Sequence, residues 1–202
     1  MTEEKLYAVF PLLRDVPLIY GIVGGSHLFG TNTGTSDMDI RLVHTSSMRM
    51  PRFLERDGYD VLLYSLHEWK ERIAAHDGIA YEMLHAPDFL IFIEREEAKE
   101  LRSERASTVT KEFVASYYEM NEREFVPLMY KDGKFSPKFA SKVIQHLRVL
   151  LTTLETGQLQ FYRDDRDELL AMKRGEWKEE ELLKEIARLK REYQTWMKKE
   201  TE

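Results

Sequence analysis

The sequence predicts an α/β fold of the α+β kind, with a small mixed-sheet core followed by a helical C-terminal half. Short apolar runs of strand length lie in the first third of the chain, whereas amphipathic patterns of helical period fill the rest. No linker rich in Gly, Ser or Pro separates these two parts. We therefore expect a core at residues 1–105 and a helical region at residues 106–202 that packs against it.

The composition is that of a folded globular protein, and it excludes several kinds of site. Hydrophobic residues make up 43% of the 202 residues and charged residues 33%, near the usual range for globular proteins. The chain has 0 cysteines, which excludes disulfide partners, zinc–cysteine sites and thiol nucleophiles. No apolar run reaches the roughly 18 residues of a membrane span, and the acidic N-terminal segment differs from a secretion signal. We expect a cytoplasmic protein with no membrane partner.

The first elements lead from a helix into a buried strand. Residues 2–14 have apolar positions at helical spacing, with Thr2 as the expected cap, and Pro11 predicts an end or kink within this helix. Residues 17–23 form a short apolar run ending in two glycines, which is typical of a buried strand that enters a tight turn. Residues 30–36 contain only Gly, Thr, Asn and Ser, so we expect a loop there.

Two further strands follow this loop. Residues 38–44 alternate between polar and apolar side chains, which places Asp39 and Arg41 on one face of the predicted strand. Arg41 then either braces the neighbouring carboxylates or lies in solvent. We expect a loop at residues 45–57 and a third strand at residues 59–66, in which one aspartate is the only ionised group.

Helices are expected in the rest of the chain. The clearest spans residues 137–156, with Pro137 in its first turn and Gly157 just past its end. The other expected helical stretches are three segments between residues 67 and 104, then residues 107–130, 165–173 and 178–199.

One constellation carries recognisable chemistry. Gly25 and Ser26 end the first strand, and 10 residues separate Ser26 from Asp37. Free backbone N–H groups and a hydroxyl at such a turn suit a phosphate oxygen. Asp37 and Asp39 project from the same face, and two carboxylates beside a phosphate cradle form a hard-oxygen site for Mg²⁺. Such a site usually recruits a third carboxylate from a neighbouring strand, and Asp60 on the third strand is well placed to supply it.

This G-S-x10-D-x-D pattern resembles the nucleotidyltransferase superfamily that includes DNA polymerase β. The segment GSHLFGTNTGTSDMDIR is more similar still to the YcgL-type family of predicted nucleotidyltransferases in bacteria and phages. The resemblance extends to GYDVLLYSLHEWKERI and PKFASKVIQHLRVLLTTLETGQL and so covers most of the chain. It implies a nucleotidyltransferase catalytic core at residues 1–105.

The resemblance also implies roles for the site residues. Asp37 and Asp39 would hold two Mg²⁺ (or Mn²⁺) ions, and Asp60 would complete the second metal's shell and accept the proton of the acceptor hydroxyl. Gly25 and Ser26 would hold the triphosphate of an NTP. The reaction would be in-line attack on the α-phosphorus with release of pyrophosphate, catalysed mainly by positioning and charge neutralisation.

A local basic face contrasts with the acidic chain. The net charge of -6 argues against a strong nucleic-acid binder. Yet in the predicted helix at 137–156, Lys138, Lys142 and Arg148 lie opposite the apolar side. This face either is a plain solvated surface or meets an anion, namely the triphosphate or an anionic acceptor.

The acceptor stays open between several classes. We favour the 3′ end of an RNA, because of the basic helix and the precedent of the superfamily. The main alternative is nucleotidylation (AMPylation) of a partner protein on Tyr, Ser or Thr, and a small molecule comes third. A nucleotide-binding module without catalysis is the alternative of a different class.

Overall fold

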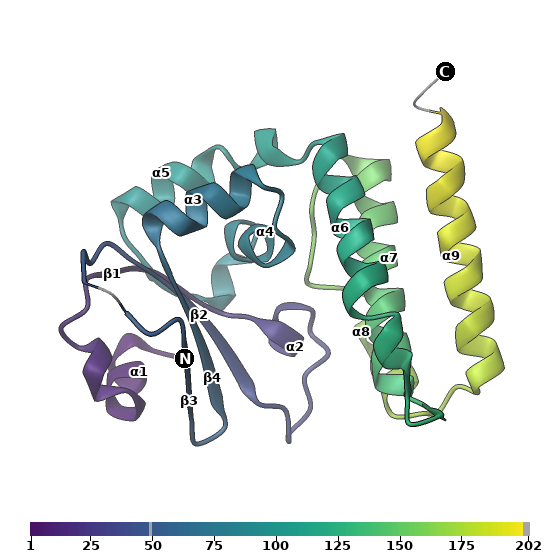
Figure 1. The fold of residues 1–202 in the computed structure, drawn as a ribbon, viewed down its shortest axis with the longest axis horizontal. Coiled ribbons are helices and arrows are strands. Elements are labelled where there is room, and N and C mark those ends of the chain that lie inside the picture. The colour runs from purple at the N-terminus through teal and green to yellow at the C-terminus, as the bar shows by residue number, and fades with distance from the viewer. Residues whose placement is uncertain (49, 200–202) are drawn as a thin grey trace. The chain divides into compact units, whose positions relative to one another are not determined.

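The α/β fold class is confirmed, with a mixed sheet in the first part of the chain and helices in the second (Figure 1). The computed structural model describes residues 1–48 and 50–199. The chain divides into two compact units, residues 1–108 and 109–202. This division lies close to the predicted boundary after residue 105.

The first unit is built on a five-stranded sheet in the order β3-β4-β2-β1-β5. β2 and β4 pair in parallel, and the other neighbours are antiparallel. Because this pairing is parallel, β2 and β4 begin at the same end of the sheet. The bounds are β1 Leu18–Val23, β2 Met38–His44, β3 Phe53–Arg56, β4 Tyr59–Ser65 and β5 Ile91–Glu94.

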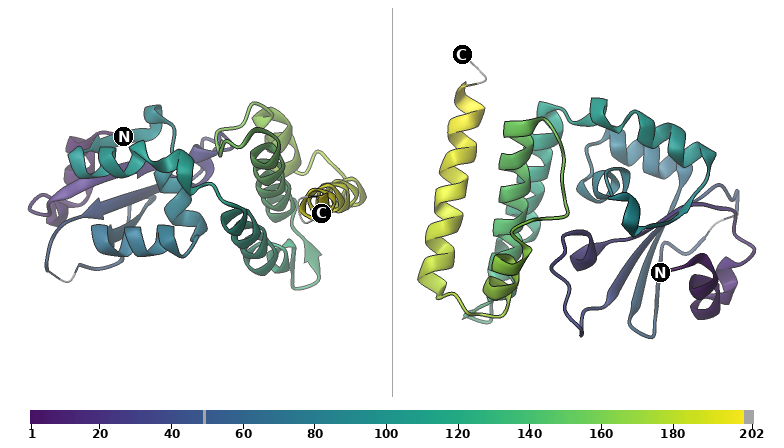
Figure 2. Two further views of the ribbon diagram at one scale, coloured as in Figure 1. Left: turned by 90° about the horizontal axis from the view of Figure 1, so that it is seen from above. Right: turned by 180° about the vertical axis from the view of Figure 1, so that it is seen from behind.

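The two faces of the sheet are covered by different helices (Figures 1 and 2). One face packs against α1 (Glu3–Val9) through a hydrophobic core that contains Ile40 and Val61. On the opposite face, the ring of Tyr20 stacks on Trp69 of α3 (Leu66–Ala74) with centroids 5.0 Å apart. The same face is covered by α4 (Gly78–Leu84) and α5 (Glu96–Ser103). Strand alternation thus decides which side chains enter which core.

The predictions for the first helix and three strands are confirmed. The expected helix at 2–14 is α1 followed by a 3₁₀ turn at Pro11–Leu13, so the proline ends the α-helix as predicted. Thr2 caps it, since its Oγ1 accepts a hydrogen bond from the N–H of Lys5 at 3.2 Å. The strands expected at 17–23, 38–44 and 59–66 are β1, β2 and β4.

Two predictions about the sheet are wrong. The expected loop at 45–57 contains the edge strand β3, which forms a hairpin with β4 through Asp57 and Gly58, at φ values of 52° and 77°. An Asp-Gly pair of this kind is the sequence signal for a two-residue hairpin turn. The expectation of helices alone after residue 66 is also wrong, because β5 adds a fifth strand beside β1. A four-residue strand is too short for periodicity to separate it from a helix.

The second unit is a group of helices around α7 (Pro137–Thr156). This helix has the predicted bounds and ends at Gly157 in the left-handed region (φ 67°). A short hairpin precedes it at residues 130–135, within a stretch for which no strand was predicted. Within residues 1–48 and 50–199, no helix is long and apolar enough to cross a bilayer. The other helices are α6 Lys111–Glu124, α8 Arg166–Lys173 and α9 Glu179–Lys199.

Candidate active site

The turn after β1 brings a glycine against a carboxylate. The chain passes from β1 through Gly24 into the four-residue helix α2 (Gly25–Leu28). Gly25 has a φ of 55°, and a Cβ atom there would lie 1.8 Å from Oδ2 of Asp39. Only glycine therefore allows this carboxylate to rest against the turn. The N–H of Gly24 donates to the backbone oxygen of Asp39 at 2.8 Å, which ties the turn to β2.

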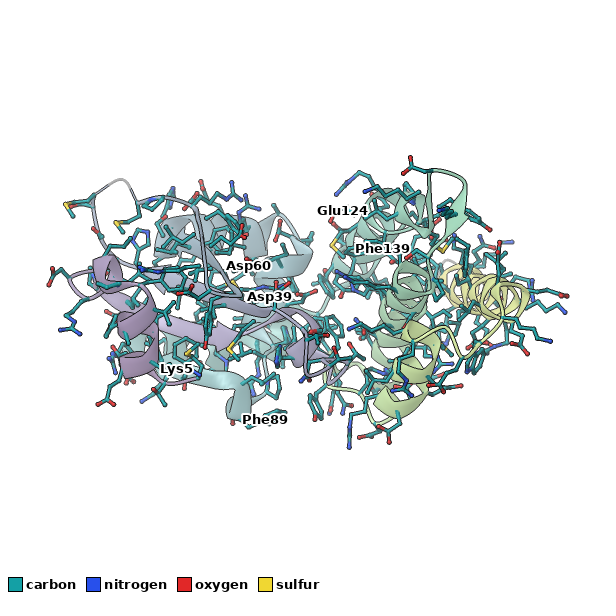
Figure 3. All side chains as sticks on the ribbon, turned by 90° about the horizontal axis from the view of Figure 1, so that it is seen from below. Lys5, Asp39, Asp60, Phe89, Glu124 and Phe139 are labelled. Atoms are coloured by element: carbon teal, nitrogen blue, oxygen red, sulfur yellow. The ribbon has the colours of Figure 1, made fainter. Side chains whose placement is uncertain are left out.

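Three carboxylates form a row across the sheet, which we call the acidic row: Glu55, Asp60 and Asp39. Asp39 of β2 is the direct register partner of Asp60 on β4, and Asp60 is the partner of Glu55 on β3. Register partners project from the same face, and Figure 3 labels Asp39 and Asp60 on their neighbouring strands. Asp37 precedes β2 and lies against the β3–β4 turn, with Oδ1 4.0 Å from the Cβ position of Gly58. The structure thus brings together the three predicted aspartates and adds Glu55.

The electrostatics of Asp60 reflect this crowding. Burial, followed by the negative charges of Glu55, Asp39 and Asp37, raises the pKa of Asp60 above its ordinary value. Like charges that face one another across neighbouring strands destabilise a sheet. A bound cation would relieve this repulsion, and a proton on Asp60 would do so in part. Glu55 was not predicted as a site residue, because it belongs to the segment at 45–57 that was expected to be a loop.

The carboxylate oxygens of this site are ligands of the type that a hard divalent cation prefers, although the described side chains do not form a complete coordination shell. Within the described residues, no three His, Asp or Glu side chains are arranged as metal ligands. Mg²⁺ usually binds through one or two carboxylates together with waters and substrate phosphates, so a three-carboxylate cage is not required. The glycine turn beside Asp39 offers the place where a phosphate would approach. Asp37, Asp39 and Asp60 are therefore the residues that would hold the metal.

A buried ion pair lies beneath the turn. Arg41 follows Asp39 on the same face of β2, and its Nη1 donates to Oε2 of Glu82 on α4. Both residues are buried, with 9% and 5% of their surface exposed. Although burial alone lowers the pKa of Arg41, the negative charges of Glu82 and Asp39 and the hydrogen bond to Glu82 raise it overall. Arg41 thus braces this end of the sheet, and the solvent alternative for it is excluded.

Arg41 also occupies the space next to the turn. A Cβ atom on Gly24 would lie 2.8 Å from Nε of Arg41. The guanidinium group is therefore in close contact with the backbone that leads into Gly25. Sequence reasoning could not identify Glu82, because it belongs to a helix 41 residues further along the chain.

Lys138 and Lys142 lie on α7 in the second unit, where they form a lysine trio with Lys173 of α8. Burial and the positive charges of Lys138 and Lys142 lower the pKa of Lys173. α8 is held against α7 by a hydrogen bond from Oγ of Ser141 to the backbone oxygen of Leu169 at 2.9 Å. Nζ of Lys142 lies 4.1 Å from the centroid of the Phe125 ring. Three cations are thus gathered on two packed helices.

The predicted basic face of this helix is smaller than expected. Arg148 is not available to an anion, because it forms ion pairs with Asp165, Glu168 and Glu185. Ser141 and Gln145, two other polar residues of α7, are buried. The face is covered by α8 and α9, whose positions the α7 pattern alone does not reveal.

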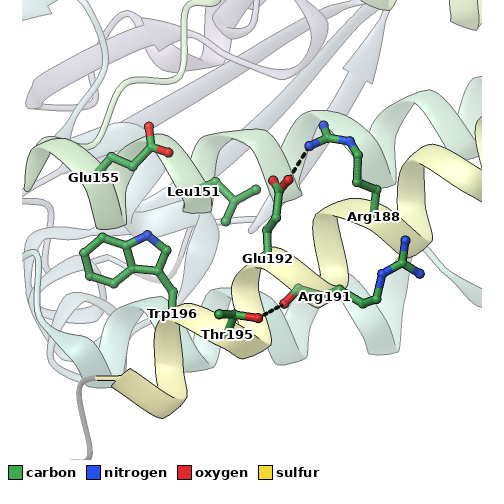
Figure 4. Close-up of a pocket in the computed structure, with 7 residues that line it drawn as sticks. All are labelled: Leu151, Glu155, Arg188, Arg191, Glu192, Thr195 and Trp196. Carbon is green, nitrogen blue, oxygen red and sulfur yellow. Dashed lines mark hydrogen bonds and ion pairs between the residues drawn. The ribbon is translucent and has the colours of Figure 1, made fainter.

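A hollow of about 380 Å³ lies in the second unit between α7 and α9 (Figure 4). Trp196 and Leu151 line it together with charged residues, and Arg188 is paired there with Glu192. None of the predicted site residues lines this hollow. The sheet end, where the predicted aspartates lie, remains the candidate active site.

Comparisons with known proteins do not identify the chain. No protein-family model matches it, and a search of curated proteins finds no match. The resemblance to nucleotidyltransferases therefore stays a prediction that rests on the residues and their geometry.

The buried ion pair makes a prediction about stability. Arg41→Met or Glu82→Leu alone should lower the free energy of unfolding by about 3–5 kcal/mol, because each leaves a buried charge without its partner. The double variant should lose less than either single one. Denaturant unfolding measures all three, with the exposed pair Arg95 and Glu3 as control, where we expect less than about 1 kcal/mol. Additive losses at Arg41 and Glu82 would contradict the pairing.

The crowding of carboxylates makes a prediction about pH and metal. Because the pKa of Asp60 is raised in the folded state, its ionised form lowers stability once the pH exceeds that value. Asp60→Asn should therefore raise the free energy of unfolding by about 0.5 kcal/mol at pH 7 without metal, and by nothing at pH 2. Added Mg²⁺ should raise the Tm of the wild type more than that of the variant. Exposed Asp15 provides the control, Asp15→Asn. Equal responses of both variants would refute the crowding.

Proposed function

We propose that the protein is a metal-dependent nucleotidyltransferase that moves a nucleoside monophosphate from an NTP to an acceptor hydroxyl. The observation that carries this proposal is the contact of the Gly25 turn with Asp39, which is itself paired in register with Asp60. A glycine turn of the kind that can bind phosphate and two carboxylates on adjacent strands thus lie close together. The YcgL-type resemblance points to the same reaction, with the 3′ end of an RNA as the favoured acceptor.

In this reaction the glycine turn would bind the triphosphate, and the aspartates would hold the metal. Backbone N–H groups at Gly25 and Ser26 would donate to oxygens of the triphosphate. Asp37, Asp39 and Asp60 would hold Mg²⁺ or Mn²⁺, which supplies charge neutralisation of the phosphates when it is bound. The acceptor oxygen forms a bond to the α-phosphorus, the bond to the β-phosphate oxygen breaks, and pyrophosphate leaves.

Asp60 is the residue best suited to take the proton of the attacking hydroxyl. It stands in register beside Asp39, and a carboxylate positioned next to the reacting hydroxyl can accept its proton. The Arg41–Glu82 pair would act as a positioning device, since it packs against Gly24 and follows Asp39 on the same strand face.

A transfer assay tests the proposal. The purified chain is incubated with Mg²⁺ or Mn²⁺, each α-³²P-labelled NTP in turn, and a mixture of cellular RNA, protein and small molecules. Label should enter an acceptor, and Asp37→Ala or Asp39→Ala should reduce the rate by at least about 100-fold because the charge of the triphosphate is no longer neutralised. Asp15→Ala is the matched control, since this aspartate is exposed elsewhere in the same unit.

The fraction that carries label decides between the candidates. Label in RNA supports the favoured acceptor, label in a protein supports nucleotidylation, and label in the small-molecule fraction supports the third class. NTP binding without label in any fraction would overturn the transferase in favour of a nucleotide-binding module. Full activity in either aspartate variant would overturn the site assignment.

We further propose that the lysine trio binds phosphate groups. Like charges four residues apart on a helix are unfavourable. The trio adds Lys173, whose pKa is lowered first by burial and then by the charges of Lys138 and Lys142. Three clustered lysines repel one another when no ligand is bound, and a bound anion would relieve this repulsion. Such unfavourable clusters are typical of binding sites.

Binding of inorganic triphosphate tests this second site. Lys138→Ala, Lys142→Ala and Lys173→Ala should each weaken its affinity by about fivefold, because each removes one charge-assisted contact. Lys184→Ala is the control, since this lysine is exposed in the same unit and paired with Glu180. Isothermal titration calorimetry at two salt concentrations measures the effect. Equal affinities for the trio variants and the control would refute the site.

A further inference from the structure

We propose that Phe53 and Leu62, which we call the apolar strip, bind the base of a single-stranded RNA acceptor beside the acidic row. This inference rests on the proposed function and names where its favoured acceptor is held. Phe53 of β3 is the register partner of Leu62 on β4, and Leu62 is the partner of Arg41 on β2. The apolar strip therefore lies on the same face of the sheet as the acidic row.

The spacing between the strip and the row suits one nucleotide. Phe53 and Leu62 each lie two residues along their strands from Glu55 and Asp60. Two residues of a strand span about 7 Å, which is comparable to the distance from a ribose hydroxyl to its own base. A nucleotide whose base lies on the strip could therefore place its terminal hydroxyl at the acidic row.

Phe53 is not needed for the core of the first unit. Phe53 is 55% exposed, whereas the next residue, Leu54, packs against the core on the α1 side of the sheet. An exposed aromatic residue on an edge strand is a liability for aggregation. Leu62 is only half-buried beside it. The pair thus offers an apolar and aromatic surface that the fold itself does not use.

The order of the strands assigns this surface to the acceptor and not to the NTP. The turn that would hold the triphosphate follows β1, whereas Phe53 lies on β3, at the other side of β2 and β4. In-line attack requires the acceptor oxygen and the leaving pyrophosphate on opposite sides of the α-phosphorus. With the triphosphate on the β1 side of the carboxylates, the acceptor must approach from the β3 side.

The charges on this edge favour a nucleic acid over an apolar partner. Arg52 directly precedes Phe53 of the strip, in a protein whose net charge is -6. The guanidinium group of Arg52 lies 5.5 Å from the centroid of the Tyr64 ring, and Tyr64 is on the same face of β4 as Leu62. A basic side chain beside an exposed aromatic ring is typical of single-strand binding surfaces, where bases stack and phosphates are neutralised.

Binding of a fluorescent single-stranded oligoribonucleotide tests the strip without turnover. Fluorescence anisotropy is measured on the full chain with Mg²⁺ and without NTP. Phe53→Ala should weaken binding by about tenfold, which is the effect of losing one stacked base, and Phe53→Trp should keep it within about twofold. Phe89→Ala is the matched control, because this phenylalanine is 66% exposed in the same unit and belongs to no part of the strip.

Steady-state kinetics distinguish a role of the apolar strip in RNA binding from a general effect of the substitution on the enzyme. In the transfer assay, Phe53→Ala should raise KM for the RNA acceptor and leave KM for the NTP unchanged. Unchanged RNA affinity in Phe53→Ala, or an equal loss in Phe89→Ala, would overturn the strip. Transfer of label to protein alone would also overturn it as an RNA site.

The two readouts distinguish failure of the strip from failure of the proposed function. RNA binding that depends on Phe53, with no transfer of label by the wild type, would leave the strip standing and refute the transferase. Transfer to RNA that is unaffected by Phe53→Ala would refute the strip alone.

Discussion

The candidate site depends on the parallel pairing of β2 with β4. In this register Asp39 faces Asp60, and the same alternation sends Ile40 and Val61 into the core against α1. A slip of one residue would turn the carboxylates into that core and the aliphatic side chains out of it. The hydrophobic core on one face therefore holds the carboxylates together on the other, although their mutual repulsion opposes it. A site that binds a cation needs this kind of enforced proximity.

The ion pair between Arg41 and Glu82 links this edge to the helices. It brings a fixed positive charge close to Asp39 and in contact with the Gly24 backbone, without neutralising the exposed end of the acidic row. Because both partners are buried, either one without the other would be strongly unfavourable. The position of α4 and the conformation of the turn are thus coupled through one contact. Such coupling gives the rigid support that a catalytic constellation requires.

Much of the fold follows from local patterns in the chain. Alternation predicted β2 and the face of Asp39, apolar runs predicted β1 and β4, and proline and glycine predicted both ends of α7. β3 was missed because an exposed edge strand has no buried face to produce a strong pattern, and only the turn at Gly58 indicated it. The basic face of α7 was overestimated because periodicity separates polar from apolar sides but does not show which neighbours cover them. The sequence therefore placed Arg148 on an open polar face, although three carboxylates of this chain surround it.

The sequence by itself determined the residue types, their spacing along the chain and the faces on which they project. Gly25, Ser26, Asp37 and Asp39 belong to one short segment, so local geometry is enough to relate them. Only the tertiary structure decided the strand order, and with it that Asp60 and Glu55 stand in one row with Asp39 and that Glu82 lies beneath the turn. The physical reason is that pairing and burial join residues far apart in the chain. Their contacts depend on how the whole sheet and its helices pack, which no local pattern encodes.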